Sequence, residues 1–238
     1  MPPSNLEPLV AFTGAGISAE SGIPTFRGDG GLWRNRRPQD VATPDAFARD
    51  PDLVWEFYRW RRKMIGGSKP NSAHELLAEI ESSLSDFTLI TQNIDGLHIA
   101  AGSRHVIELH GSVWGMLCSE CQARWTDHRV ELPPGLPRCE SCGGIARPDV
   151  VWFGETLDPA VLNQAGQAAK KASVMLIIGT SAVVHPAAQL PLLALEAGAH
   201  LVEINPDKTP LSRFVQESFI ATATMGLSQW WASANPSE

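Results

Sequence analysis

The chain has 238 residues, of which 43% are hydrophobic and 19% charged, and its formal net charge at pH 7 is −7. This composition excludes a disordered chain, and the acidic balance excludes the basic footprint that holds a nucleic-acid backbone. The sequence contains neither the run of about 18 apolar residues that crosses a membrane nor a signal-peptide pattern at its start. We therefore expect a cytoplasmic protein with no membrane and no nucleic-acid partner.

Short apolar runs of strand length alternate with helical patterns along the chain. The strand-like runs lie at 9–12, 87–91, 106–109, 174–178 and 200–204. Helical patterns lie between several of them, at 72–84, 159–172 and 187–197. This alternation predicts an α/β protein with a Rossmann-like, doubly wound parallel sheet, whose ligands bind at the carboxyl ends of the strands.

Two segments interrupt the alternation. Residues 40–69 are helical in pattern and rich in Trp, Phe and Arg, and residues 114–148 hold all the cysteines. We therefore expect a core formed by 1–113 and 149–238, with a helical insertion at about 40–70 and a small zinc-ribbon-like module at 114–148.

A glycine-rich segment follows the first predicted strand. Gly14-Ala15-Gly16-Ile-Ser18-Ala19 fits the pattern G-x-G-x-x-A, in which glycines allow a tight turn and a close approach of the backbone to a pyrophosphate. The acidic residue that a dehydrogenase carries about 20 residues later is missing, because 24–31 has the composition of a loop. Taken alone, the segment is a weak signal, because an ordinary strand-to-helix turn is the alternative.

Polar side chains follow the other predicted strands. They are Gln92, Asn93 and Asp95, then Glu108 and His110, then Thr180 and Ser181 after Gly179, and finally Asn205. In a parallel sheet these groups converge on one crevice. Singly, each is better explained as a cap or a core hydrogen-bonding group, so the prediction of a site depends on the joint pattern.

The cysteines form two pairs, Cys118-x-x-Cys121 and Cys139-x-x-Cys142, separated by seventeen residues. This spacing is typical of a tetrahedral zinc site with four thiolate ligands. Four ligands leave no open position for catalysis, so the predicted Zn²⁺ is structural, with one ion per chain. The alternative is four free or disulfide-bonded cysteines.

These motifs occur together and in order with Val151-Trp-Phe-Gly-Glu155 and His110-Gly111, and the chain thereby resembles the sirtuin family over nearly its whole length. The resemblance implies an enzyme that removes acyl groups from lysine with NAD as co-substrate, releasing nicotinamide and O-acyl-ADP-ribose. Acyl-lysine proteins or peptides are the implied partners, and we expect a monomer.

The resemblance also implies roles for individual residues. His110 is the implied general base for a ribose hydroxyl, a task that suits an imidazole with an ordinary pKa near 6.5. Asn93 and Asp95 would line the nicotinamide pocket, and the substrate peptide would add as a β-strand to Val151, Trp152, Phe153, Gly154 and Glu155. The implied NAD-binding residues are Gly14, Ala15, Gly16, Ser18, Glu20, Thr25, Phe26, Arg27, Trp33, Gln92, Asn93, Ile94, Asp95, Gly179, Thr180, Ser181, Asn205, Pro206, Asp207 and Ala223. Ala223 is assigned to adenine although 221–230 departs from the family's usual pattern.

The helical insertion bears on the acyl group. One helical stripe, expected to face the core, consists of Leu53, Phe57, Trp60 and Met64. A second row consists of Val54, Tyr58, Arg61 and Ile65. Tyr58 and Arg61 are three residues apart, so a phenol and a guanidinium lie together and suit a carboxylate.

This Tyr-x-x-Arg arrangement is similar to the sirtuin branch that removes succinyl, malonyl or glutaryl groups. We therefore expect a desuccinylase and demalonylase with some deacetylase activity. The alternative on the helix is a solvent-exposed Arg61, as on any amphipathic helix. The alternatives for the whole chain are a plain deacetylase, a mono-ADP-ribosyltransferase, a non-catalytic NAD-binding scaffold, or a zinc-ribbon nucleic-acid module.

Overall fold

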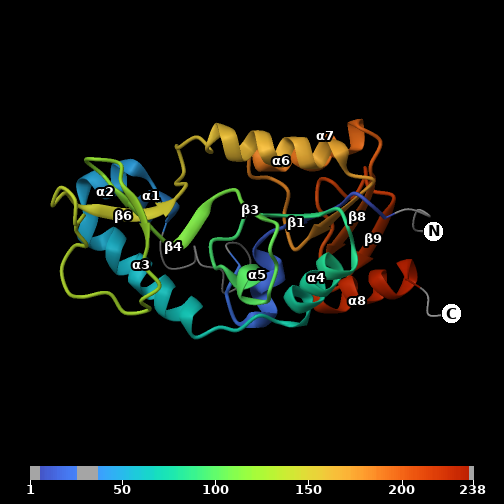
Figure 1. Cartoon of the computed structure of the whole chain (residues 1–238), viewed down its shortest axis with the longest axis horizontal. Coiled ribbons are helices and arrows are strands. Elements are labelled where there is room, and N and C mark those ends of the chain that lie inside the picture. Colours follow the sequence, from blue (N-terminus) through green and yellow to red (C-terminus); the bar gives the residue numbers. More distant parts are fainter. Residues whose placement is uncertain (1–5, 26–36, 236–238) are drawn as a thin grey trace.

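A six-stranded parallel sheet is the centre of the computed structural model, which describes residues 6–25 and 37–235 (Figure 1). Its strands are β1 (Leu9–Thr13), β2 (Phe87–Thr91), β3 (Val106–Glu108), β7 (Val174–Ile178), β8 (His200–Asn205) and β9 (Glu217–Ile220). The order β3-β2-β1-β7-β8-β9 is that of a doubly wound sheet, and the strand order reverses between β1 and β7. The predicted fold class is confirmed.

Helices cover both faces of this sheet (Figure 1). On one face lie α4 (Ser72–Ser83) and α8 (Ala223–Ala234), and on the other lie α6 (Pro159–Lys171), η3 (Ala187–Gln189) and α7 (Leu190–Glu196). Successive residues of β1 alternate between two apolar clusters, one on each face, and none is more than 2% exposed. A strand covered on both faces reads as an unbroken apolar run, which is why the sequence pattern located it.

The two interrupting segments form a smaller unit of helices and an antiparallel sheet. The helical segment contains α1 (Pro38–Val41), α2 (Pro44–Arg49) and α3 (Pro51–Gly66). The second sheet is antiparallel, in the order β5 (Arg124–Thr126), β4 (Gly111–Cys118) and β6 (Ala146–Val150). A third apolar cluster joins the helices to this sheet. The remaining short helices are η1 (Ala15–Ser21) and α5 (Leu97–Ala100).

Local sequence explains where α3 begins. Asp50 accepts a hydrogen bond from the N–H of Leu53 at 2.9 Å, and Pro51 occupies the first helical position, where its missing N–H costs nothing. No helix of the described residues is long and apolar enough to cross a bilayer.

The buried face of α3 differs from the prediction. Trp60, expected in the core stripe, is 48% exposed. The row Val54, Tyr58, Arg61 and Ile65 is at most 4% exposed. The physical reason is that α3 packs with the second sheet and with Trp152 in the third cluster, so the row containing Tyr58 faces inward.

Candidate functional site

Two loops meet at the carboxyl edge of the large sheet, where the strand order reverses. The N–H of Gly14 donates to the oxygen of Ile178 at 3.0 Å, and the N–H of Gly16 donates to the oxygen of Gly179 at 2.8 Å. A Cβ on Gly16 would lie 2.7 Å from the Cα of Gly179, closer than real Cβ contacts. Glycine is therefore required where the loops after β1 and β7 touch.

The loop after β2 completes this crevice. Gln92 Nε2 donates to Thr180 Oγ1 at 2.9 Å, and Asn93 Nδ2 donates to the oxygen of Gly14 at 3.2 Å. His110 Nδ1 lies 2.8 Å from the oxygen of Gln92. The structure thus brings together side chains that the sequence pattern assigned to one edge of the sheet.

A buried polar network lies beneath the crevice. Ser18 Oγ donates to Asp95 Oδ2 at 2.8 Å, and Asn93 Nδ2 donates to Ser18 Oγ at 3.2 Å. His74 Nε2 reaches Ser18 Oγ at 3.4 Å. The sequence analysis missed His74, because it lies in the first turn of α4, where an Asn71 cap was the only local signal.

A second histidine was also missed. Thr13 Oγ1 donates to Thr91 Oγ1 at 2.9 Å, so Thr13 Oγ1 accepts from His98 Nε2, 3.0 Å away. His98 Nδ1 is then the unprotonated nitrogen, and it is buried without a hydrogen-bond partner among the described residues. Burial, with a smaller effect of neighbouring His74, lowers the pKa of His98 to about 3.

The hydrogen bond of His110 fixes a tautomer in which one ring nitrogen can act as a base. Its Nδ1–H donates to the backbone oxygen of Gln92, so Nε2 carries the lone pair. Burial lowers the pKa of His110, and the bond to Gln92 opposes this effect only in part. The expectation of an ordinary pKa near 6.5 is therefore corrected downward. Two residues earlier, burial and the charge of Asp95 raise the pKa of Glu108 to about 7.

The predicted NAD-binding residues of the first loop lie in several environments. Ala15 and Ser18 belong to η1, which is a 3-10 helix and not an α-helix. Glu20 is exposed, and its carboxylate accepts from the N–H and Oγ1 of Thr224 at 3.1 and 2.7 Å, tying η1 to α8. Thr25 is the last residue described before the gap. Phe26, Arg27 and Trp33 lie outside the described residues.

The remaining NAD-binding assignments fall on β8, α8 and the loops near them. Asn205 ends β8, and its Nδ2 donates to the oxygen of Asp207 at 2.7 Å, while Pro206 and Asp207 are exposed. Ala223 is buried in the apolar cluster with Leu227, so its side chain contributes to the core. Ser181 follows β7 and is exposed. The backbone oxygen of Ile94 accepts a hydrogen bond from the N–H of Val113 at 2.9 Å. Their contacts with NAD stay predictions.

Tyr58 and Arg61 are both 4% exposed, which excludes the solvent-exposed alternative for Arg61. Burial raises the pKa of Tyr58 to about 12, so the phenol stays protonated. Burial also lowers the pKa of Arg61, and the nearby Tyr58 and Asp95 oppose this effect. The guanidinium therefore lies in the interior, on the side of α3 that faces Asp95.

The segment 151–155 corrects another expectation. Strand β6 ends at Val150, and the next residues form a turn in which the Glu155 N–H donates to the Trp152 oxygen at 3.0 Å. Gly154 has φ of 90°, and the Phe153 N–H already donates to Ala42. The segment is therefore a turn rather than a strand, and its contact with a substrate peptide stays a prediction. Phe153 is 49% exposed beside it.

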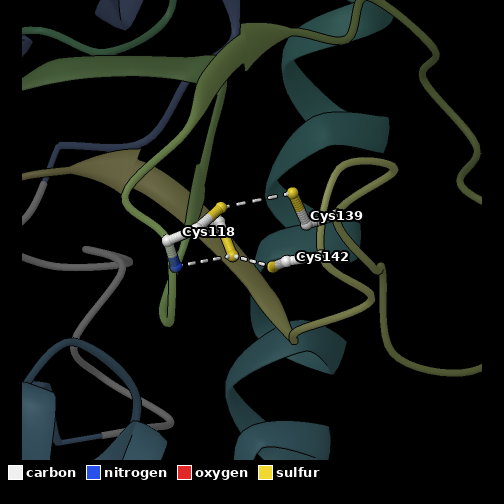
Figure 2. Close-up of side chains that lie close together, drawn as sticks. Cys118, Cys139 and Cys142 are labelled. Carbon is white, nitrogen blue, oxygen red and sulfur yellow. Dashed lines mark hydrogen bonds between the residues drawn. The ribbon is translucent and has the colours of Figure 1, made fainter.

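The four cysteines form a cluster. Their sulfur atoms lie within 4.8 Å of one another, with Cys118 Sγ 3.4 Å from Cys142 Sγ and Cys121 Sγ 3.7 Å from Cys139 Sγ. Figure 2 shows the sulfur atoms of Cys118, Cys139 and Cys142 turned toward one another. A tetrahedron with Zn–S bonds of about 2.3 Å has S···S edges of about 3.8 Å, so these positions fit a structural zinc ion. Backbone N–H groups of residues 120, 121 and 144 donate to the sulfurs, as in a zinc knuckle.

The comparisons with known proteins all indicate the same family. The model of the Sir2 family matches residues 14–186. A protein of Aquifex aeolicus named NAD-dependent protein deacylase is 49% identical over 219 residues, covering 92% of each chain. The solved structure of a Sir2 homologue in complex with NAD is 47% identical with a TM-score of 0.90, covering 95% of this chain and 88% of that one. A Sir2 complex with p53 peptide and NAD⁺ is 34% identical with a TM-score of 0.82, covering 96% and 94%.

Proposed function

The chain belongs to the Sir2 family, and we propose that it is an NAD-dependent protein-lysine deacylase that prefers acidic acyl groups. Succinyl-lysine and malonyl-lysine in proteins or peptides are the proposed substrates, with some activity on acetyl-lysine. The observation that carries the acidic preference is the buried pair of Tyr58 and Arg61 on α3.

The donor set of the crevice supports NAD as the co-substrate. These donors lie at the carboxyl edge of the large sheet, at the point where the strand order reverses. Doubly wound sheets bind dinucleotides at this point. The Gln92 amide and the Thr180 hydroxyl are neutral groups that suit ribose and phosphate oxygens. When bound, NAD supplies the ADP-ribosyl group that accepts the acyl group as nicotinamide leaves. The NAD complex of a similar Sir2 homologue supports the same choice.

His110 is the proposed base. The Gln92 oxygen holds its Nδ1–H, and Nε2 is left to take a proton from a ribose hydroxyl. Its lowered pKa keeps Nε2 unprotonated at neutral pH, so most molecules hold the base in its active form. Asn93 and Asp95, fixed by Ser18, are proposed to orient the nicotinamide amide.

Tyr58 and Arg61 are proposed to bind the acyl carboxylate. A carboxylate forms strong, charge-assisted hydrogen bonds with a buried guanidinium. The protonated phenol of Tyr58 donates a further bond. An acetyl group carries no carboxylate, so it gains nothing from either side chain.

The test uses the zinc-loaded protein with NAD and matched peptides that carry succinyl-, malonyl- or acetyl-lysine, with products followed by mass spectrometry. Arg61→Met removes the guanidinium and is expected to lower kcat/KM for the succinyl peptide, relative to the acetyl peptide, about 10- to 100-fold. Arg59→Met is the matched control on the same helix, because Arg59 donates to the backbone oxygen of Pro133 and not toward the crevice.

Each other outcome has a defined meaning. Removal of acetyl alone, unaffected by Arg61→Met, would leave a plain deacetylase and reject the acidic pocket. Transfer of ADP-ribose to protein without loss of any acyl group would favour the mono-ADP-ribosyltransferase alternative. Loss of deacylation in His110→Asn, with NAD binding retained, is expected if His110 is the base.

A further inference from the structure

Trp152 and Tyr58 meet in the interior, between the turn after β6 and helix α3. Trp152 Nε1 lies 2.9 Å from Tyr58 Oη, and the two residues are 3% and 4% exposed. An indole N–H can only donate, so the Tyr58 oxygen is the acceptor in this bond. The phenol therefore keeps its own O–H proton for another partner, and the bond from the indole constrains the direction in which that proton points.

The side chains around the Trp152 indole hold the indole in its position. The Arg147 guanidinium lies 3.5 Å from the centre of the Trp152 ring, and the Phe47 ring lies 5.3 Å from it on centroids. Arg147 forms a two-pronged ion pair with Glu155, at 2.5 and 2.9 Å. Glu155 Oε2 also accepts from the Trp152 N–H at 2.8 Å. A continuous series of contacts thus runs from Glu155 through Arg147 and Trp152 to Tyr58.

Polar contacts add direction to the apolar packing of this ring. Trp152, Phe47 and Arg147 border a hollow of about 440 Å³ between α2, the start of α3 and the cysteine-bearing sheet. The hydrogen bond to Tyr58 and the stacked Arg147 are directional contacts, and they help to set the angle of the buried indole.

We propose that Trp152 is a positioning residue for acyl specificity, which holds the Tyr58 phenol so that its proton is directed at the carboxylate of an acidic acyl group. The inference rests on the proposed function and deepens it, because it assigns acyl choice to a residue outside the Tyr-x-x-Arg pair. The strength of a hydrogen bond to a carboxylate falls steeply with its angle, so the direction of this one proton matters.

The test compares Trp152→Phe, which keeps a flat ring and removes the N–H, with the wild type. The ratio of kcat/KM for succinyl and acetyl peptides is expected to fall about tenfold, through a higher KM for the succinyl peptide. Tyr58→Phe is expected to lower the ratio by a similar factor. The double variant should fall no further, because both changes remove the same directed proton.

Trp55→Phe is the matched control. Trp55 is 1% exposed in the same cluster, and its Nε1 donates to the Ala146 oxygen at 2.9 Å. Its loss should lower the melting temperature about as much as Trp152→Phe does, but leave the acyl ratio unchanged. Arg147→Met, a second variant that keeps the indole N–H and frees the ring, should lower the ratio in the same direction as Trp152→Phe.

Two results would overturn the inference. A wild-type acyl ratio in Trp152→Phe, or a ratio that falls additively in the double variant with Tyr58→Phe, would separate Trp152 from the phenol while Arg61→Met still reports an acidic pocket. If the wild type itself shows no preference for succinyl and Arg61→Met changes nothing, the proposed function fails and the inference fails with it.

Discussion

Acid should destabilise this fold through His98, which lies under the glycine-rich loop and donates to Thr13 at the end of β1. Its Nδ1 is buried without a partner among the described residues, so protonation there would bury a charge that no hydrogen bond compensates. The pKa of His98 falls to about 3 for this reason. In the unfolded chain the same imidazole titrates near its ordinary value of about 6.5.

The sign and size of the effect follow from linkage. Between the two pKa values the unfolded chain binds a proton that the folded chain does not, so the free energy of unfolding falls as the pH falls. The contribution of His98 is complete above pH 6.5 and is lost progressively below it. Between pH 7 and pH 5 the loss from this one residue is about 2 kcal/mol. The lowered pKa of His74 adds a loss of the same sign.

The assay is urea unfolding of the zinc-loaded protein at pH 7 and pH 5. His98→Gln, which keeps an N–H donor and cannot titrate, should lose about 2 kcal/mol less than the wild type over this interval. His185→Gln is the control, because His185 is exposed and should leave the pH dependence unchanged. Equal losses for wild type and His98→Gln would refute the argument. An acid loss of zinc would affect both proteins equally, so it cancels when the change of the variant is subtracted from the change of the wild type.

Three further predictions follow from buried or clustered groups. Metal analysis should give one zinc per chain, and chelation should lower the melting temperature and abolish deacylation; a chain equally stable without metal would contradict the structural role. Glu81→Ala should lower the free energy of unfolding in urea by about 2–4 kcal/mol, because Glu81 accepts the backbone N–H groups of Arg104 and His105. Glu81→Gln keeps one side-chain oxygen as an acceptor, so it should lower the free energy of unfolding by less than half as much as Glu81→Ala. The acid limb of kcat/KM should have its midpoint below pH 6.5, since burial lowers the pKa of His110, and a midpoint at or above 6.5 would count against this base.

The large sheet was predictable because its signals are local. Every residue of β1 and β7 is buried, so β7 is an unbroken apolar run and β1 is one up to Phe12. The glycines after them are required by a contact between two loops, and Gly14 and Gly16 mark it in the sequence. The cysteine spacing is equally local, because each pair forms its own turn around the metal position. Edge strand β9 carried no such signal, since its four residues are only half-buried or exposed.

The residues that were missed depend on contacts between distant parts of the chain. His74 reaches Ser18 across 56 positions, and His98 reaches Thr13 across 85. Nothing near either histidine in the sequence reveals its partner. Trp152 was assigned to the substrate, but its hydrogen bond with Tyr58, across 94 positions, was not predicted for the same reason. The burial of α3 was misjudged for a related reason, because helical periodicity defines faces but not which face meets another unit.

The neighbouring arginines of α3 explain why zinc should matter to a pocket that contains no zinc ligand. Arg61 lies near Tyr58 and Asp95, whereas the next residue, Arg62, donates from Nε to the Val113 oxygen at 3.1 Å and binds the Asp127 oxygen. Both of those oxygens belong to the sheet region whose strand β4 ends at Cys118. We expect that without the metal this region becomes less ordered, so that Arg62 loses its acceptors and α3 loses one of its contacts with the second sheet. The acyl pocket beside Arg61 would then lose its geometry, so chelation should reduce the preference for succinyl over acetyl before activity disappears.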